Sequence, residues 1–486
     1  MKKALLGLTA LTAACICLSA CGSVYEGGMS HYPEALAPDG NFRYDEVIEQ
    51  DYSLVTDKAT SYFSLDRNTA SYSQVRSQIE DGSAPHSDSV RIEEMINYFE
   101  YDYPAPDDGA VKVTGYLSDC PWNADNKLML VGMKTIEYSL EAENANYVFL
   151  IDVSGSMSGD NRIGLAKQGL SMLTDELGGG DLVSIVTYAS GVDTLLDGGE
   201  CSESGKAKIK KAISKLNAYG STNGGDGLKR AYSVAQKHFI SGGNNRVIII
   251  SDGDFNVGMT GTDEMKEFIQ EKAKSGIYLS VLGVGMGNMR DDMLNTLATC
   301  GNGNYAYIDN LTEARKVLVD ELDGTLKTVA KDAKAGVTFT DAVEKYRLIG
   351  YDTKLISEDD FDNDKADTGE LGSNLCISAL YEITLLDEAE GKLADIEVKY
   401  KDVTGATEKT ASATAQVSLS SPSSSDLDFI GCVAEFGLIL RNSKYKGTAS
   451  LKAVISRLGD LSPYLSGDDY KREFVTLVGK YSEIGF

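Results

Sequence analysis

The chain has 486 residues, of which 42% are apolar and 24% are charged, as in ordinary globular proteins of about two to four domains. This composition excludes a chain that is disordered throughout and a membrane protein with many spans. The formal net charge of −27 at pH 7 opposes binding to nucleic acid and favours divalent cations or basic partners. Three histidines leave little room for His-based catalysis or a multi-His zinc site.

The N-terminus has the features of an export signal. Lys2 and Lys3 precede an apolar stretch that ends in Leu18-Ser19-Ala20-Cys21, the pattern of a bacterial lipoprotein signal. We therefore predict a signal peptide over 1–20, lipidation of Cys21, and an extracytoplasmic chain anchored by lipid at the cell membrane or cell surface. The alternative is an ordinary secretory signal that happens to contain a cysteine.

Five cysteines follow the predicted lipidation site, and they are widely spaced. Their odd number and their spacing argue against a disulfide framework, although one bridge stays possible. None lies in a Cys-x-x-Cys pair, so a thiolate metal site is not expected. The five are Cys120, Cys201, Cys300, Cys376 and Cys432.

Residues 21–45, with scattered Gly and Pro, are predicted to be a tether. Residues 46–144 form an N-terminal region with a small module of mixed structure. Its predicted elements are a strand at 62–65 and a helix at 91–99, where Ile92, Met95, Ile96 and Phe99 follow helical spacing.

Strands and helices alternate over residues 145–332. The apolar strands at 147–152 and 246–251 are continuous rather than alternating, which indicates burial on both faces. The pattern predicts an α/β fold with a doubly wound, mostly parallel sheet, closed by a long helix over 311–332. The other predicted strands are 182–188, 277–282 and 305–308, and the other predicted helices are 163–177, 206–216, 228–239 and 265–274.

The remainder divides into a β-rich and a helical part. Short alternating segments over 333–419 predict a β-sandwich-like module. Within it, the acidic segment 360–364 resembles a calcium loop but lacks the required Gly and Glu, so we expect a solvated loop. After a Ser-rich linker, residues 420–486 are predicted to be helical around 429–440, 451–458 and 474–481.

One set of oxygen-bearing side chains is suited to binding a ligand. Asp152, Ser154 and Ser156 follow directly on the first buried strand, where ligands bind in parallel sheets. Thr222 lies in a Gly-rich loop that opens a helix, and Asp252 directly follows the strand at 246–251. Three hydroxyls and two carboxylates form a hard oxygen site that suits Mg²⁺ or Mn²⁺. A further acidic ligand would come from a partner.

These five residues resemble the metal-ion-dependent adhesion site (MIDAS) of von Willebrand factor type A (VWA) domains, in order and in strand–helix context. The resemblance implies metal ligation by Asp152, Ser154, Ser156, Thr222 and Asp252, completed by a partner's carboxylate.

The rest of the chain is similar to one subfamily of bacterial VWA lipoproteins. The similarity rests on segments such as 62–66, 91–99, 120–123 and 346–351. One departure is Arg67-Asn68, where a hydrophobic residue and Asp are expected. The other is Gly372-Ser-Asn-Leu-Cys376, where a small-residue turn followed by His is expected.

The resulting hypothesis is a membrane-anchored adhesion protein of the cell envelope. Its metal site would engage an acidic group of a protein or other extracellular macromolecule, and we expect no enzymatic activity. Two alternatives stay open. In the first, the ion activates water in a metal-dependent hydrolase. In the second, the protein is an envelope scaffold whose metal only stabilises the fold.

Overall fold

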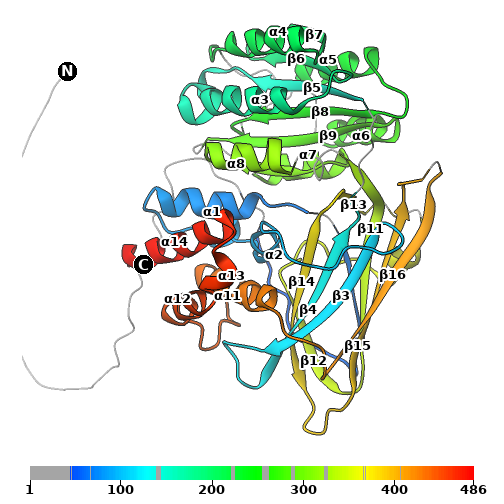
Figure 1. Ribbon diagram of the computed structural model, residues 1–486, viewed down its shortest axis with the longest axis vertical. Coiled ribbons are helices and arrows are strands. Elements are labelled where there is room, and N and C mark those ends of the chain that lie inside the picture. The colour runs from blue at the N-terminus through cyan, green and yellow to red at the C-terminus, as the bar shows by residue number, and fades with distance from the viewer. Residues whose placement is uncertain are drawn as a thin grey trace, which may run out of the picture. The chain divides into compact units, whose positions relative to one another are not determined.

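Three β-sheets and a cluster of helices make up the described part of the chain in this computed structural model (Figure 1). The predicted signal peptide, Cys21 and most of the predicted tether lie outside the described residues. Those are 44, 46–65, 67–137, 144–220, 225–253, 262–285, 291–321, 327–364, 366, 368–405 and 407–485.

The α/β domain contains a six-stranded sheet with the order β10-β9-β8-β5-β6-β7. All neighbours are parallel except β7, which pairs antiparallel with β6 at one edge. This confirms the predicted α/β fold, although the edge strand β7 was not predicted. The strands are β5 (Ala145–Asp152), β6 (Leu182–Tyr188), β7 (Val192–Glu200), β8 (Asn244–Ser251), β9 (Ile277–Val284) and β10 (Tyr305–Ile308).

Helices cover both faces of this sheet because its central strands are apolar on both sides. In β5, Phe149 and Ile151 face one core with α3, α4 and α8, whereas Val148 and Leu150 face a second core with α5, α6 and α7. Burial of every residue of β5 follows from this sandwiching. The helices are α3 (Leu165–Glu176), α4 (Glu203–Ser214), α5 (Gly225–Lys237), α6 (Thr262–Lys274), α7 (Asp291–Cys300) and α8 (Leu311–Arg315).

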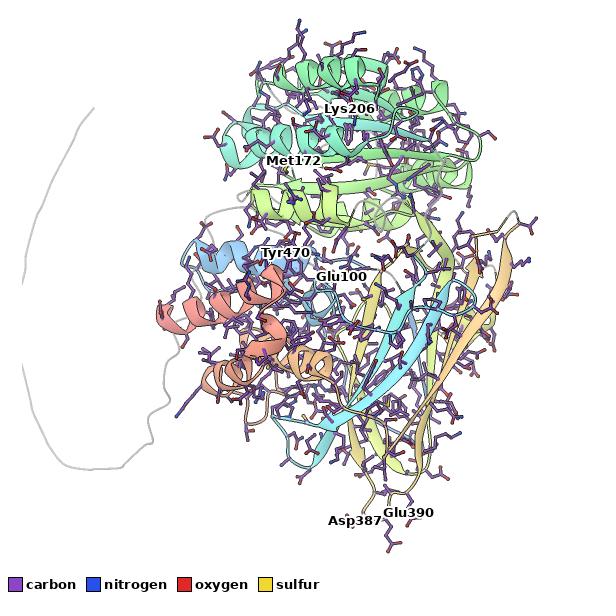
Figure 2. All side chains as sticks on the ribbon, viewed as in Figure 1. Glu100, Met172, Lys206, Asp387, Glu390 and Tyr470 are labelled. Atoms are coloured by element: carbon purple, nitrogen blue, oxygen red, sulfur yellow. The ribbon has the colours of Figure 1, made fainter. Side chains whose placement is uncertain are left out.

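The other two sheets pack face to face around an apolar core of their own, separate from the two cores of the α/β domain. The first sheet has the order β1-β12-β14-β4-β3, and the second has β13-β11-β15-β16 with β2 paired to β11. Figure 2 shows Asp387 and Glu390 at the turn from β14 to β15. The strands are β1 (Ser53–Leu54), β2 (Thr60–Ser64), β3 (Val111–Asp119), β4 (Asn126–Thr135), β11 (Thr328–Phe339), β12 (Val343–Ile349), β13 (Gly369–Gly372), β14 (Cys376–Leu385), β15 (Lys392–Asp402) and β16 (Lys409–Ser418).

The α/β domain is inserted into this β-sandwich. Strands from before it pair with strands from after it, since β4 pairs with β14 and β2 pairs with β11. The predicted segments 46–144 and 333–419 are therefore interleaved in one sandwich. Local periodicity indicates that a strand exists but not which distant strand completes its hydrogen bonds.

One of the predicted helices was wrong. The helix expected over 311–332 ends at Arg315 and continues only as a π-helical turn, η4 (Lys316–Asp320), and residues from Thr328 onward form β11. The segment 328–335 is rich in Ala and Lys, which favour helices. Pairing with β2, β13 and β15 overrides that preference and buries Val329, among others.

The C-terminal helices pack with two N-terminal helices on one aromatic-rich core. Phe99, Phe429 and Phe474 contact one another edge to face, with ring centroids 5.0–5.8 Å apart. All three predicted C-terminal helices are present. The helices are α1 (Ala70–Glu80), α2 (Ile92–Ile96), α11 (Ser425–Leu440), α12 (Leu451–Asp460), α13 (Ser462–Leu465) and α14 (Asp469–Ile484), with the short turn η1 (Ser87–Ser89). The short helix α10 (Glu358–Asp362) lies apart from them, against β2 and β11.

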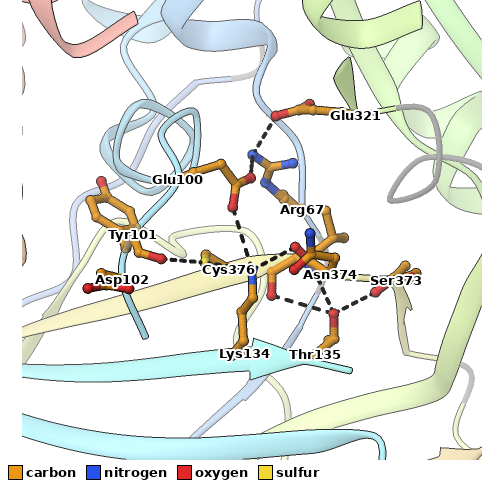
Figure 3. A network of polar contacts seen from close by, with 12 residues as sticks. Arg67, Glu100, Tyr101, Asp102, Lys134, Thr135, Glu321, Ser373, Asn374 and Cys376 are labelled. Atoms are coloured by element: carbon orange, nitrogen blue, oxygen red, sulfur yellow. Dashed lines mark hydrogen bonds and ion pairs between the residues drawn. The ribbon is translucent and has the colours of Figure 1, made fainter. Parts of the chain in front are cut away.

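Buried ion pairs join the end of the α/β domain to the N-terminal segment (Figure 3). Arg67 donates to Glu321 at 2.9 Å and to Glu100 at 3.1 Å, and Lys316 also donates to Glu321. The Cys376 thiol, on the facing strand β14, donates to the Tyr101 carbonyl. Both departures from the subfamily pattern, at Arg67 and Cys376, thus lie in one polar network.

We expect Glu321→Gln to lower the free energy of unfolding by about 2 kcal/mol at pH 7, because it removes the carboxylate between two buried cations. Burial opposes ionisation, but the charges of Arg67 and Lys316 hold the pKa of Glu321 at about 2, against 4.5 normally. This stabilisation is therefore complete above pH 4.5 and is lost as the pH falls toward 2. Urea unfolding at pH 7 and pH 3 measures the free energy of unfolding of both proteins. The difference in this free energy between wild type and variant should be smaller at pH 3. Glu344→Gln, at an exposed position, is the control. The same difference in free energy of unfolding at both pH values would contradict the ion-pair assignment.

A second cluster centres on Arg76 of α1, whose side chain is 3% exposed. Its guanidinium donates at 2.7 Å each to Asp309 after β10, Glu313 of α8 and Glu473 of α14. The Tyr98 hydroxyl completes the cluster by donating to Glu313 at 2.7 Å. One cation thus connects the α/β domain with the N-terminal and C-terminal helices.

Candidate metal site

The candidate site lies where the chain changes direction within the parallel sheet. From β5 the chain proceeds outward to β6 and β7, then crosses back to β8 on the other side of β5. At such a switch point the connections leave in opposite directions, and a crevice opens at the carboxyl ends of the two strands. Asp152 ends β5 and Asp252 follows β8, so both carboxylates lie beside this crevice.

Asp152 is fully buried and held by its neighbours. One carboxylate oxygen accepts a hydrogen bond from the Ser154 backbone at 2.8 Å, and the other accepts from the Ser251 hydroxyl at 3.4 Å. Tyr188, its register partner on β6, lies beside it and interacts with it electrostatically. The carboxylate is therefore fixed at the mouth of the crevice.

The two serines come from the tight turn that follows β5. The hydroxyls of Ser154 and Ser156 are 2.9 Å apart, so they present two oxygens side by side. The turn η2 (Gly155–Met157) is anchored by the buried side chain of Met157. Arg162 donates to the Ser156 carbonyl at 2.7 Å and braces the turn from outside.

The two aspartates are close enough to affect each other's ionisation. Burial raises the pKa of the Asp152 carboxyl to about 6, and the negative charge of Asp252 adds to the rise. Asp252 is itself only 2% exposed. Two buried carboxylates at one crevice repel each other, and a bound cation would offset both charges.

Thr222, the remaining predicted ligand, lies outside the described residues. The segment before it reaches the same edge of the sheet. The Tyr219 backbone donates to the Val153 carbonyl at 2.7 Å, and the Gly155 backbone donates to the Gly220 carbonyl at 2.9 Å. The structure thus brings four of the five predicted ligands together: Asp152, Ser154, Ser156 and Asp252.

The donor set fits a hard divalent cation. It offers two carboxylates and two hydroxyls, which are oxygen ligands of the kind that Mg²⁺ and Mn²⁺ prefer. Within the described part of the chain, no three side chains of the His, Cys, Asp or Glu type are grouped so as to hold a metal. A site here would therefore depend on the serine hydroxyls as well as on the aspartates.

Three supporting residues were not predicted from the sequence. Ser251 hydrogen-bonds to Asp152, Tyr188 lies beside it on β6, and Arg162 supports the serine turn. Tyr188 and Ser251 are the last residues of β6 and β8, the strands on either side of β5. Their position at adjacent strand ends is the one sequence signal that could have identified them.

The remaining cysteines offer no reactive centre among the described residues. All five are free thiols, and four are buried. Burial and the nearby Glu382 carboxylate raise the pKa of Cys120 to about 12, so its thiol stays protonated at neutral pH. This agrees with the expectation that no disulfide framework is present.

Family models match most of the chain. A model for the von Willebrand factor type A domain matches residues 147–254, and a model described as von Willebrand factor matches 39–130. A third, described as "Uncharacterized protein YfbK, C-terminal", matches 324–419 and 387–484.

Individual proteins extend this comparison. The protein named "Uncharacterized protein YfbK" of Escherichia coli strain K12 is 35% identical over 475 residues, which are 91% of this chain and 81% of that one. Inter-alpha-trypsin inhibitor heavy chain H3 of Mesocricetus auratus is 26% identical over 52% of this chain and 30% of its own length. A solved von Willebrand factor type A structure from Catenulispora acidiphila has a TM-score of 0.41 at 16% identity, over 76% of this chain and 91% of that one.

The inserted α/β domain and its matching model place the chain among proteins with a von Willebrand factor type A domain. Identity of 35% along nearly the whole chain, together with the C-terminal match, is more specific. The chain belongs to the YfbK family.

None of the helices in the described residues has the length and apolar character needed to cross a membrane. The predicted lipid anchor at Cys21 lies outside those residues and stays a prediction.

Proposed function

We propose that this protein is a lipid-anchored, extracytoplasmic binding protein of the cell envelope that engages an acidic group of a protein partner through a divalent metal. The observation that carries the proposal is the grouping of Asp152, Asp252 and two serine hydroxyls at the switch point of the sheet. Asp152, Ser154, Ser156, Thr222 and Asp252 would hold Mg²⁺ or Mn²⁺.

Each side chain has a separate task in this proposal. The aspartates supply negative charge that neutralises the cation, and the serines supply neutral oxygens that leave the ion short of anionic ligands. A carboxylate of the partner would satisfy that shortage. Ser251 orients Asp152 by donating a hydrogen bond to its carboxylate, as outer residues commonly orient metal ligands.

We propose binding rather than catalysis because no general base accompanies the aspartates among the described residues. His86 interacts with Asp88, and the His238 ring pairs with Asp197 at 2.6 Å. Neither hydrogen-bonds to Asp152 or Asp252. A hydrolase would need a group there to move a proton.

The test is capture from envelope extract by immobilised residues 22–486. Partner capture should require Mg²⁺, disappear in EDTA, and disappear with Asp152→Ala. Blocking the extract's carboxylates by amidation should also abolish it, because the partner supplies the acidic ligand. The exposed Asp263→Ala is the control.

Other results would favour the two alternatives. Capture that survives both EDTA and Asp152→Ala would refute the proposal. A large loss of thermal stability in EDTA, combined with no metal-dependent capture of a partner, would favour a scaffold role, and substrate turnover lost on chelation would favour a hydrolase.

A further inference from the structure

A groove of about 560 Å³ crosses the outer face of the sheet that contains β11. Two rows of cross-strand neighbours form its floor, each spanning β2, β11, β15 and β16 in turn. The rows are Tyr62, Gly336, Glu397, Thr414 and Thr60, Thr338, Asp395, Gln416.

The groove exists because Gly336 has no side chain. A Cβ atom built there would lie 3.0 Å from the Phe361 ring and 3.2 Å from the Tyr62 ring. These two rings pack against each other with centroids 4.8 Å apart and form one wall. Phe361 belongs to the acidic segment 360–364, for which a loop was predicted. Residues 360–362 instead complete the short helix α10, and the Phe361 ring is buried.

The floor carries hydrogen-bonding groups with little net charge. The hydroxyls of Thr60 and Thr338 are 3.1 Å apart. Asp395 accepts from Gln416 at 2.9 Å and pairs with Lys392 at 2.7 Å, so its charge is matched.

Glu397 lies between these groups and differs from them. It is half-buried in the floor, and no described residue hydrogen-bonds to its carboxylate or forms an ion pair with it. A carboxylate in this position offers acceptors for hydroxyl donors of a ligand.

We infer that this groove binds an uncharged glycan. Sugar rings have an apolar C–H face, which packs on an aromatic ring, and a rim of hydroxyls, which bond to carboxylate, amide and hydroxyl groups. Tyr62 supplies the ring, and Glu397, Thr414 and Gln416 supply the partners. Anionic glycans would be repelled by Glu397, and an apolar ligand would leave these polar groups without partners.

Calorimetry on residues 22–486 tests the proposal, because this chain retains every residue that the structure describes. The probes are cellotetraose, maltotetraose and N-acetylchitotetraose, with tetragalacturonate as the anionic comparison. At least one neutral probe should bind saturably, and Tyr62→Ala and Glu397→Ala should each weaken it about tenfold or more. Thr414→Ala should weaken it less, and Thr410→Ala, exposed on the same strand outside the groove, should not change it.

Binding should persist in EDTA, which separates this site from the proposed metal site. The proposal fails if no neutral probe binds, if tetragalacturonate binds more tightly, or if Tyr62→Ala binds like wild type. Urea unfolding of each variant identifies a loss of binding caused by unfolding. If Tyr62→Ala unfolds, Glu397→Gln decides the question, because it keeps the size of the side chain and removes its charge.

Discussion

Asp152→Ala is expected to abolish saturable Mg²⁺ or Mn²⁺ binding to residues 22–486, whereas the wild type binds one ion. Asp152 is fully buried, and both oxygens of its carboxylate are held, one by the Ser154 backbone and the other by the Ser251 hydroxyl. Loss of residues that only orient a ligand lowers metal affinity about 10- to 100-fold, so loss of the ligand itself should exceed this.

Titration calorimetry of the two proteins side by side measures the effect. Metal should also raise the thermal midpoint of the wild type but not of the variant, because an ion that binds only the folded state stabilises it. Asp263→Ala, at an exposed position on α6, should behave as wild type. Equal affinity in wild type and Asp152→Ala would show that the ion binds elsewhere, and absence of binding in the wild type would contradict an autonomous metal site.

Arg76→Met is expected to lower the free energy of unfolding by about 3–5 kcal/mol, the usual effect of removing one partner from a buried ion pair. Asp309, Glu313 and Glu473 all bond to this one guanidinium. Without it, three neighbouring carboxylates would repel one another, two of them almost fully buried. Burial already raises the pKa values of Glu313 and Glu473, so these carboxylates should take up protons more readily in the variant than in the wild type.

Urea unfolding at pH 7 measures the change, with Arg472→Ala as the matched control. Arg472 pairs with Asp469 on the exposed surface of α14, where such pairs contribute at most about 1 kcal/mol. Adding Glu313→Gln to Arg76→Met should restore part of the stability, since it removes one of the carboxylates that has lost its ion pair with Arg76. If Arg76→Met changed the free energy of unfolding by less than about 1 kcal/mol, this would contradict the role of Arg76 in connecting the α/β domain with the N-terminal and C-terminal helices.

Several features were predictable because they depend on short-range patterns. The continuous apolar runs of β5 and β8 indicated burial on both faces, and helical spacing located α11, α12 and α14. The candidate ligands were predictable for the same reason, because Asp152 and Asp252 directly follow buried strands and parallel strands end at a common edge.

Other features depend on which distant segments pair. Residues 328–335 favour a helix on composition, yet they form part of β11 because β2 and β15 provide hydrogen-bond partners on either side. No local pattern indicates that Tyr188 supports Asp152, since strand order decides which strand ends are neighbours.

The sequence by itself therefore determined the α/β class and indicated the candidate metal ligands, since apolar periodicity and ligand spacing are local properties. Only the tertiary structure decided that the α/β domain is inserted into a β-sandwich, that Arg76 joins three regions, and that Gly336 opens a groove. These arrangements arise from contacts between residues hundreds of positions apart, and such contacts follow from how whole sheets and helices pack.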